Sequence, residues 1–235
     1  MTGTLYLLPM LLGESHPDIS IPGEVQNITT SLSHFYAENI KTTRRYLRKL
    51  DKSFDIDGSH FYVLNKKTND EDLSEMMNPL LQGFDGGIIS EAGLPGIGDP
   101  GSKLVRLAHK KNIKVKPLTG PSSFVLALVA SGLNGQSFAF NGYLPVKGQE
   151  LTKKIQEIEK RSTQLKQTQI FMETPYRNNQ LLEQLLKTCH SQTQLCIAVN
   201  ITTDQENILT QSINQWKSSN PDLHKKPAVF AILKA

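Results

Sequence analysis

Short apolar runs alternate with amphipathic stretches along the first half of the chain, and this alternation constrains the fold most. Loops separate each predicted strand from the helix that follows it, which is the spacing of βαβ units. Parallel strands require such crossover connections. The first half therefore predicts an α/β domain. Its strands are expected at Thr4–Leu8, Phe61–Leu64, Gly86–Ser90 and Val115–Leu118, and its helices at Asn27–Ala37, Thr42–Leu50, Asp70–Gln82 and Ser102–Lys111.

The second half predicts a second α/β domain. A proline and a Gly-Pro turn interrupt the chain within Lys116–Gly120, so we expect domains at 1–117 and 118–235. The segment Gln205–Leu209 fits either kind of element. The other strands are expected at Phe138–Tyr143, Gln169–Met172, Cys196–Val199 and Ala228–Leu233, and the helices at Ser122–Ala130, Leu151–Lys160, Asn178–Thr188 and Ile213–Ser218.

The composition is that of a globular protein, since 235 residues with 38% hydrophobic content can bury one large core or two modest ones. The apolar N-terminal run lacks a basic leader and is too short to span a bilayer, so it predicts a strand and a cytoplasmic protein. Cys189 and Cys196 have neither metal nor CxxC spacing, and the histidines are scattered, so no metal site is predicted. The net charge of +4 permits an RNA partner without requiring one.

The densest chemical signal is the segment Ser90–Gly101, which reads SEAGLPGIGDPG between a predicted strand and a predicted helix. Its glycines and prolines favour a loop whose backbone N–H groups can approach a ligand closely. Open α/β sheets bind ligands at this end of a strand. Neither a Walker A nor a GxGxxG pattern is present, which disfavours a phosphate cradle. A purely structural turn is the alternative.

A second signal is the segment Pro117–Phe124, which reads PLTGPSSF. Ser122 and Ser123 can cap the helix that follows. The free N–H groups at that helix start can also hold a carboxylate. Capping alone is the simpler interpretation of this motif by itself, whereas its position beside the glycine-rich loop at a domain junction favours a binding cleft.

Taken in chain order, these motifs resemble those of the RsmI-type 16S ribosomal RNA (cytidine-2'-O-) ribose methyltransferases, a family within the tetrapyrrole methylase superfamily. The glycine-rich loop resembles the family signature S-D-A-G-T-P-x-x-x-D-P-G. The matches are collinear over nearly the whole chain, so the chain resembles a divergent member. Further matches are Leu5–Pro9 to the first strand, Ala37–Asn39 with Thr43–Arg44 to A-E-D-T-R, Gly142–Lys147 to G-[FY]-L-P-x-K, and Phe171–Arg177 to F-Y-E-S-x-x-R.

The resemblance implies two α/β domains with the methyl donor, S-adenosyl-L-methionine, in the cleft between them, and a homodimer. It also implies that the acceptor is ribosomal RNA or the small ribosomal subunit. Carried over residue by residue, the donor contacts are expected at Pro9, Ser90, Glu91, Ala92, Gly93, Ile97, Ser122, Ser123, Met172, Pro227 and Ala228.

The acceptor side departs from the family pattern. Asn65–Asp70 contains no histidine where the family has H-x-H-N-E. Val199–Glu206 lacks the arginine, first glutamate and lysine of R-E-L-T-K-x-x-E, and Lys226-Pro227 replaces a Gly-Glu pair. The donor side is thus retained, while the identity of the acceptor is left open.

A ribose hydroxyl is a poor nucleophile until its proton leaves, so a base is useful for this reaction. Glu91 is favoured as a donor contact rather than as the base, and the catalytic residue is not identified. Lys147 and Arg177 stand on family-matching positions and are either functional cations or solvated surface charges. The carboxylates considered as bases are Glu38, Glu91, Asp99 and Glu173.

Three functions remain open at this stage. The first is 2'-O-methylation of ribosomal RNA, and the second is methylation of a small molecule such as a tetrapyrrole. The third is non-catalytic binding of the donor. The basic helix Arg44–Lys49, with Lys147 and Arg177, is the predicted RNA face. The alternative for this helix is an ordinary solvated surface.

Overall fold

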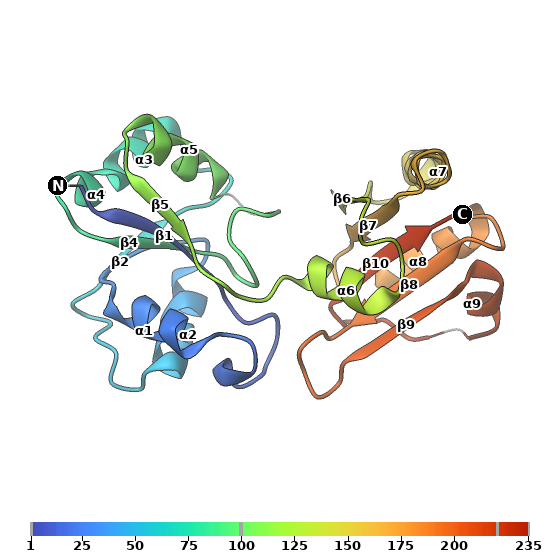
Figure 1. Ribbon diagram of the computed structural model, residues 1–235, viewed down its shortest axis with the longest axis horizontal. Helices are drawn as coiled ribbons and strands as arrows, with labels where there is room; N and C mark the ends of the chain where they lie inside the picture. Colours follow the sequence, from blue (N-terminus) through green and yellow to red (C-terminus); the bar gives the residue numbers. More distant parts are fainter. Residues whose placement is uncertain (1, 99–100, 220, 235) are drawn as a thin grey trace. The chain divides into compact units, whose positions relative to one another are not determined.

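The computed structural model describes residues 2–98, 101–219 and 221–234 (Figure 1). The chain divides into two compact units, Met1–Ser122 and Ser123–Ala235, each with its own sheet. Both units combine helices and strands, as the sequence predicts. The candidate base Asp99 lies outside the described residues.

The described part of the first unit contains a five-stranded sheet in the order β3-β2-β4-β1-β5. Every neighbouring pair in it is parallel. The carboxyl ends of all these strands therefore lie at one edge of the sheet. The strands are β1 (Thr4–Leu8), β2 (His34–Ala37), β3 (His60–Val63), β4 (Gly86–Ile89) and β5 (Lys114–Pro117).

Helices cover both faces of this sheet. Leu47 of α2 packs with Leu8 in one core cluster, and Leu104 of α5 packs with Leu5 in another. Burial on both faces is typical of parallel sheets, and it explains why β4 is buried at every position. The first-unit helices are α1 (Gly23–Ser31), α2 (Ile40–Leu50), α3 (Asp70–Met76), α4 (Asn78–Leu81) and α5 (Ser102–Lys110), with a 3-10 turn at Pro17–Ile19.

The described part of the second unit contains a five-stranded sheet in the order β6-β7-β10-β8-β9. The pair β6–β7 is parallel and the other pairs are antiparallel. The strands are β6 (Phe138–Tyr143), β7 (Thr168–Met172), β8 (Gln194–Val199), β9 (Asn207–Ser212) and β10 (Ala228–Leu233). The helices are α6 (Ser123–Ser131), α7 (Gly148–Leu165), α8 (Asn178–Thr188) and α9 (Ile213–Ser219).

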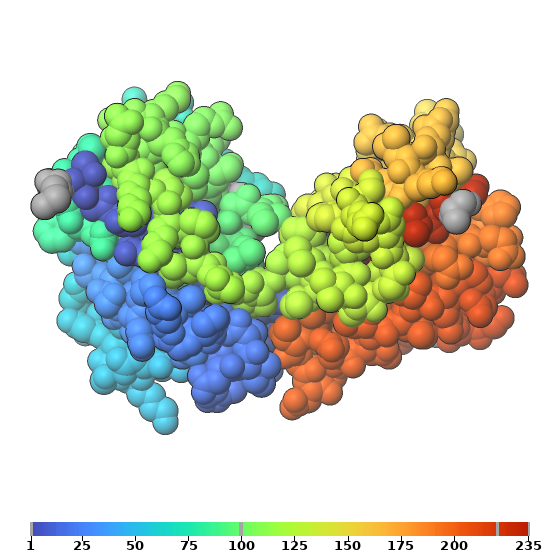
Figure 2. All heavy atoms as spheres, viewed as in Figure 1, coloured from blue at the N-terminus to red at the C-terminus, as the bar shows by residue number. Residues whose placement is uncertain are grey.

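The two faces of the second sheet have different covers. Ile155 of α7, Leu185 of α8 and Trp216 of α9 pack with Phe230 in one core cluster. The helix α6 packs across β7, β8, β9 and β10, and the Thr210 hydroxyl donates to the Ser131 carbonyl at 2.8 Å. Successive side chains along β9 point to opposite faces of the sheet, and Thr210 points toward α6. The helix α6 therefore lies on the face opposite α9. Figure 2 shows the outer surface of α6 in yellow-green.

The helix predicted at Asn27–Ala37 is wrong in its second part. The helix α1 ends at Ser31, and His34–Ala37 forms the central strand β2. Leu32 has extended backbone angles of φ −82° and ψ 152°, which stop the helix. The residues of β2 are buried on both faces of the sheet. The strand therefore lacks the alternation of apolar and polar residues by which a sequence distinguishes a strand from a helix.

The helix predicted at Asp70–Gln82 is divided into α3 and α4 at Met77. Pro79 has no backbone N–H to donate within a helix, so a continuous helix is disfavoured there. The ambiguous segment Gln205–Leu209 is resolved as the start of strand β9. No helix among the described residues is both long enough and apolar enough to cross a membrane.

We expect Cys189 and Cys196 to be unreactive in the native protein. Both side chains are buried, and desolvation raises the pKa of Cys189 to about 12 and shifts the pKa of Cys196 in the same direction. The nucleophilic thiolate is therefore scarce near neutral pH. Titration with a thiol reagent should label neither thiol in native protein and both thiols in denaturant. Rapid labelling of either thiol before unfolding would contradict this burial.

Candidate functional site

Three loops meet at the carboxyl edge of the first sheet. They follow β1, β4 and β5, which are neighbours in the sheet. Met10 and Gly93 join the first two loops through a pair of backbone hydrogen bonds: Met10 N–H donates to the Gly93 carbonyl at 2.8 Å, and Gly93 N–H donates back at 3.1 Å. The glycine-rich segment predicted as a ligand loop is therefore fixed to the end of β1.

Gly93 has a backbone conformation that other residues rarely adopt. Its φ is +68°, and a Cβ built there lies 3.1 Å from Leu12 Cδ2 and 3.3 Å from the Pro121 carbonyl oxygen. The position is thus restricted by backbone angle and by contact with the loops after β1 and β5. This restriction accounts for the glycine that the sequence motif contains.

Pro9 is the second point where these loops are held together. It is buried, and Gly120 packs so closely that a Cβ on it lies 2.1 Å from Pro9 Cβ. The buried Tyr46 hydroxyl donates to the Pro9 carbonyl at 3.1 Å, and burial raises the pKa of Tyr46, so this hydroxyl stays protonated. Tyr46 is a site-supporting residue that the sequence motifs do not identify.

Glu91 is positioned by the beginning of α2. Its Oε1 accepts from Asn39 Nδ2 at 3.1 Å and from the Thr42 hydroxyl at 3.4 Å. The Asn39 side chain also caps α2 by accepting from the backbone N–H groups of Lys41 and Thr42. The Glu91 carboxylate is therefore oriented by a helix start that follows β2, the strand beside β4.

The other predicted residues of the loop after β4 differ in exposure. Ser90 is buried and its hydroxyl donates to the Ala92 carbonyl at 3.2 Å, whereas Ala92 and Ile97 are exposed. Glu38 stands at the end of β2, where its N–H donates to the Ile89 carbonyl at 3.4 Å. Glu38 and Ser90 line the same small cavity. The structure thus places the candidate base Glu38 beside the predicted donor loop.

The predicted second-unit contacts gather at one edge of the second sheet. The Ser123 hydroxyl lies 4.0 Å from Met172 Sδ, and Met172 ends β7 next to the beginning of β10 at Ala228. The Pro227 carbonyl accepts from Asn200 N–H at 2.9 Å. Ser122, the last residue of the first unit, is buried.

Glu173 and Arg177 form an ion pair with each other. The Glu173 carboxylate is buried and accepts from Thr174 N–H at 2.6 Å and from the Arg177 guanidinium. That side-chain hydrogen bond raises the pKa of Arg177. The two candidates are therefore engaged with one another. Lys147 is exposed at the N-cap of α7, where no side-chain capping bond is made.

The described residues contain no group of three or more His, Cys, Asp or Glu side chains arranged to hold a metal ion.

The chain is similar to known methyltransferases. A model of the tetrapyrrole (corrin/porphyrin) methylases matches residues 33–216. Ribosomal RNA small subunit methyltransferase I of Vibrio cholerae is 34% identical over 204 residues, which are 87% of this chain and 67% of that protein. The protein of the same name from Pasteurella multocida is 31% identical over 175 residues, which are 73% of this chain and 61% of that protein. The matches thus span about two thirds or less of these relatives.

Solved structures confirm the predicted two-domain α/β fold. The methyltransferase CobJ has a TM-score of 0.64 and 16% identity, with 100% of this chain and 95% of that chain covered. Uroporphyrin-III C-methyl transferase from Thermus thermophilus, complexed with S-adenyl homocysteine, has a TM-score of 0.58 and 12% identity, with 99% and 98% covered. At these identities the likeness concerns the fold alone.

We expect Gly120→Ala to destabilise the first unit. The added methyl group overlaps the Pro9 ring, and overpacking of this kind costs about 1–3 kcal/mol. Gly23→Ala is the matched control, because a Cβ at Gly23 meets no atom of the residues that the structure describes within 4 Å. Urea unfolding should show a lower midpoint for the first variant alone. Equal midpoints would show that the loops do not pack as described.

Proposed function

The chain belongs to the tetrapyrrole (corrin/porphyrin) methylase family and, within it, to the group of ribosomal RNA small subunit methyltransferase I, and from this premise we propose that it methylates a ribose 2'-hydroxyl of small-subunit ribosomal RNA with S-adenosylmethionine as donor. The observation that carries the proposal is the convergence of the three loops on the Met10–Gly93 backbone pair, because it builds the family's donor motif into a defined site.

The residues of the first unit fit such a donor. A Cβ on Gly96, which has φ +86°, meets no atom of the described residues within 4 Å, so none of these residues covers the loop backbone there. Glu91 offers an oriented carboxylate at the same loop. When bound, S-adenosylmethionine supplies a methyl group on a positively charged sulfur. Ser123, Met172, Pro227 and Ala228 are proposed as further donor contacts, in agreement with the family motif.

The chain's own contribution is to orient the reactants and to accept a proton. Methyl transfer needs an in-line approach, so a site held by Gly93, Pro9 and Gly120 favours the reaction through positioning. Glu38 is the proposed proton acceptor, because it directly follows β2, the strand beside β4, and shares a cavity with Ser90. Glu91 is held by two donors and is proposed as a binding residue.

A small-molecule acceptor is not favoured. The likeness to CobJ and to uroporphyrin-III C-methyl transferase concerns the fold alone, whereas the more similar sequences are named for ribosomal RNA. From the family resemblance we also propose that the protein is a homodimer and that it acts on ribosomes in the cytoplasm.

The direct test of the proposed function is transfer of labelled methyl from S-adenosylmethionine to isolated small ribosomal subunits that lack the modification. We expect the label in the RNA, on a ribose 2'-oxygen. Label absent from the RNA but present on an added tetrapyrrole would replace the proposed acceptor.

Gly93→Val should weaken binding of S-adenosylhomocysteine at least tenfold, which corresponds to about 1.4 kcal/mol. The side chain crowds Leu12 and the Pro121 carbonyl and so displaces the loop. Gly132→Val is the matched control, since Gly132 has the same φ of +68° in the second unit and no described residue comes within 4 Å of its Cβ. Calorimetry should separate the two variants. Similar affinities would remove this loop from the donor site.

The surface of α2 suggests which cations contact RNA. The Arg44 guanidinium lies 4.9 Å from the Phe61 ring centroid, and Arg48 donates to the Lys52 carbonyl. Arg45 and Lys49 are exposed and four residues apart, so they share one face of the helix. We propose this face as a phosphate contact.

Replacing Arg45 and Lys49 by alanine should weaken RNA binding and flatten its dependence on salt by roughly one logarithmic unit per lost contact. The matched control replaces Arg106 and Lys110 of α5, which have the same types, spacing and exposure on the opposite face of the sheet. Filter binding at several salt concentrations provides the measurement. Equal salt slopes for both double variants would show that α2 is a solvated surface.

A further inference from the structure

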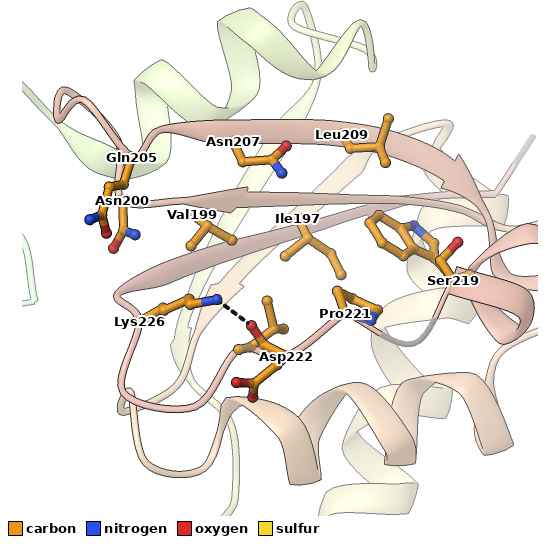
Figure 3. Close-up of a pocket in the computed structure, with 12 residues that line it drawn as sticks. Ile197, Val199, Asn200, Gln205, Asn207, Leu209, Ser219, Pro221, Asp222 and Lys226 are labelled. Atoms are coloured by element: carbon orange, nitrogen blue, oxygen red, sulfur yellow. Dashed lines mark hydrogen bonds between the residues drawn. The ribbon is translucent and has the colours of Figure 1, made fainter.

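The second unit contains a pocket of about 360 Å³ that none of the predicted donor contacts lines (Figure 3). It lies between the strands β8 and β9 on one side and residues 221–226 on the other. Its volume falls within the range of roughly 300–1,000 Å³ that small-ligand pockets occupy. The pocket is large enough to accept an organic group rather than water alone.

The floor of the pocket is formed mainly by apolar side chains. Ile197 pairs with Leu209 and Val199 pairs with Asn207 across the two strands, so alternate residues of both strands face the pocket. Trp216 also lines the pocket, and its indole N–H donates to the Leu195 carbonyl at 2.8 Å. Since that donor is used internally, the indole offers its apolar surface to an occupant.

Amide side chains border this floor where β8 ends and β9 begins. Asn200, Gln205 and Asn207 line the pocket from the end of β8 to the beginning of β9. Within residues 2–98, 101–219 and 221–234, none of these three side-chain amides makes a hydrogen bond. Each amide presents both a donor and an acceptor. The pocket therefore combines an apolar slot with unused pairing groups at its border.

Opposite charges stand on the other side of the pocket. The Asp222 carboxylate accepts from Asn179 Nδ2 and from His224 N–H, both at 3.0 Å, and these bonds lower its pKa. Asp222 therefore stays ionised. Lys226 Nζ donates to the Asp222 carbonyl at 2.8 Å, as the dashed line in Figure 3 shows, and retains further N–H groups for an anion.

We propose that this pocket holds one unpaired nucleotide of the RNA acceptor, with its base over the Ile197–Leu209 floor and its phosphate toward Lys226. Proteins recognise single-stranded RNA by stacking splayed bases on aromatic side chains and by hydrogen bonds to the base edges. Trp216 is the aromatic side chain that lines this pocket, next to its aliphatic floor. Asn and Gln amides and an Asp carboxylate match those edges. The assignment rests on the proposed function, because it names a substrate subsite of that activity.

The single tryptophan of the chain reports directly on the pocket, because Trp216 is that residue. Titration with a short unstructured oligoribonucleotide should change Trp216 fluorescence saturably. Asn207→Ala should weaken this binding about five- to tenfold, the effect of one lost hydrogen bond. Asn214→Ala is the matched control, since Asn214 is exposed on α9 and does not line the pocket. Unchanged emission of both variants without RNA shows that they fold.

Several results would overturn the assignment. They are no binding of the oligoribonucleotide at low salt, binding seen by anisotropy of a labelled strand without a change in Trp216, and equal affinities of the two variants. Competition by S-adenosylhomocysteine would move the pocket into the donor site. A mononucleotide that binds as tightly as the oligoribonucleotide would assign it to free nucleotides.

Methylation of small subunits is measured in parallel and separates the two proposals. Suppose that the parent protein does not methylate small subunits, while the change in Trp216 fluorescence on RNA binding still depends on Asn207. The proposed function then fails and the pocket assignment stands. If the parent protein and the Asn207→Ala variant methylate and bind RNA equally, the pocket assignment fails and the proposed function stands.

Discussion

The backbone pair between Met10 and Gly93 is the constraint on which the first-unit site depends. It joins the loops that leave two adjacent parallel strands, at the point where the strands themselves no longer bond. Such loops lack a repeating ladder, so this bridge is what ties the loop after β4 to the loop after β1 at Gly93. The crowding around Gly93 disfavours any residue other than glycine at that position. The hydrogen bond from Asn39, which follows β2, to Glu91 connects the end of a third strand to the same group of loops.

Two of the three stretches that depart from the family motif lie in the second unit. The stretch Val199–Glu206 departs from the family motif, and Val199, Asn200 and Gln205 from this stretch line the second-unit pocket. Lys226, which stands where the family has a Gly-Glu pair, lines it as well. Two of the three motif changes that leave the acceptor open in the sequence therefore meet at this pocket, whereas the third, Asn65–Asp70, lies in the first unit, whose donor loop retains its glycines.

Much of the fold follows from local pattern, because β1, β6, β10 and α8 have the predicted bounds. The strand β2 was missed because full burial removes its periodicity. At the site, Ser90, Glu91 and Gly93 belong to a recognisable motif, whereas the roles of Asn39 and Tyr46 depend on partners 52 and 37 residues away. Contacts between residues so far apart in the sequence can be predicted only when the order of the strands in the sheet is known. That order cannot be read from a single sequence.

The ion pair between Glu173 and Arg177 bears on which carboxylate can accept a proton. The Glu173 carboxylate is buried and hydrogen-bonded to the Arg177 guanidinium, so loss of either partner leaves the other uncompensated. Glu173 is therefore suited to fixing the turn between β7 and α8. Glu38 lies at the carboxyl edge of the first sheet, where it lines the same cavity as Ser90. Glu38, the proposed proton acceptor, therefore stands beside the loop that carries the donor motif.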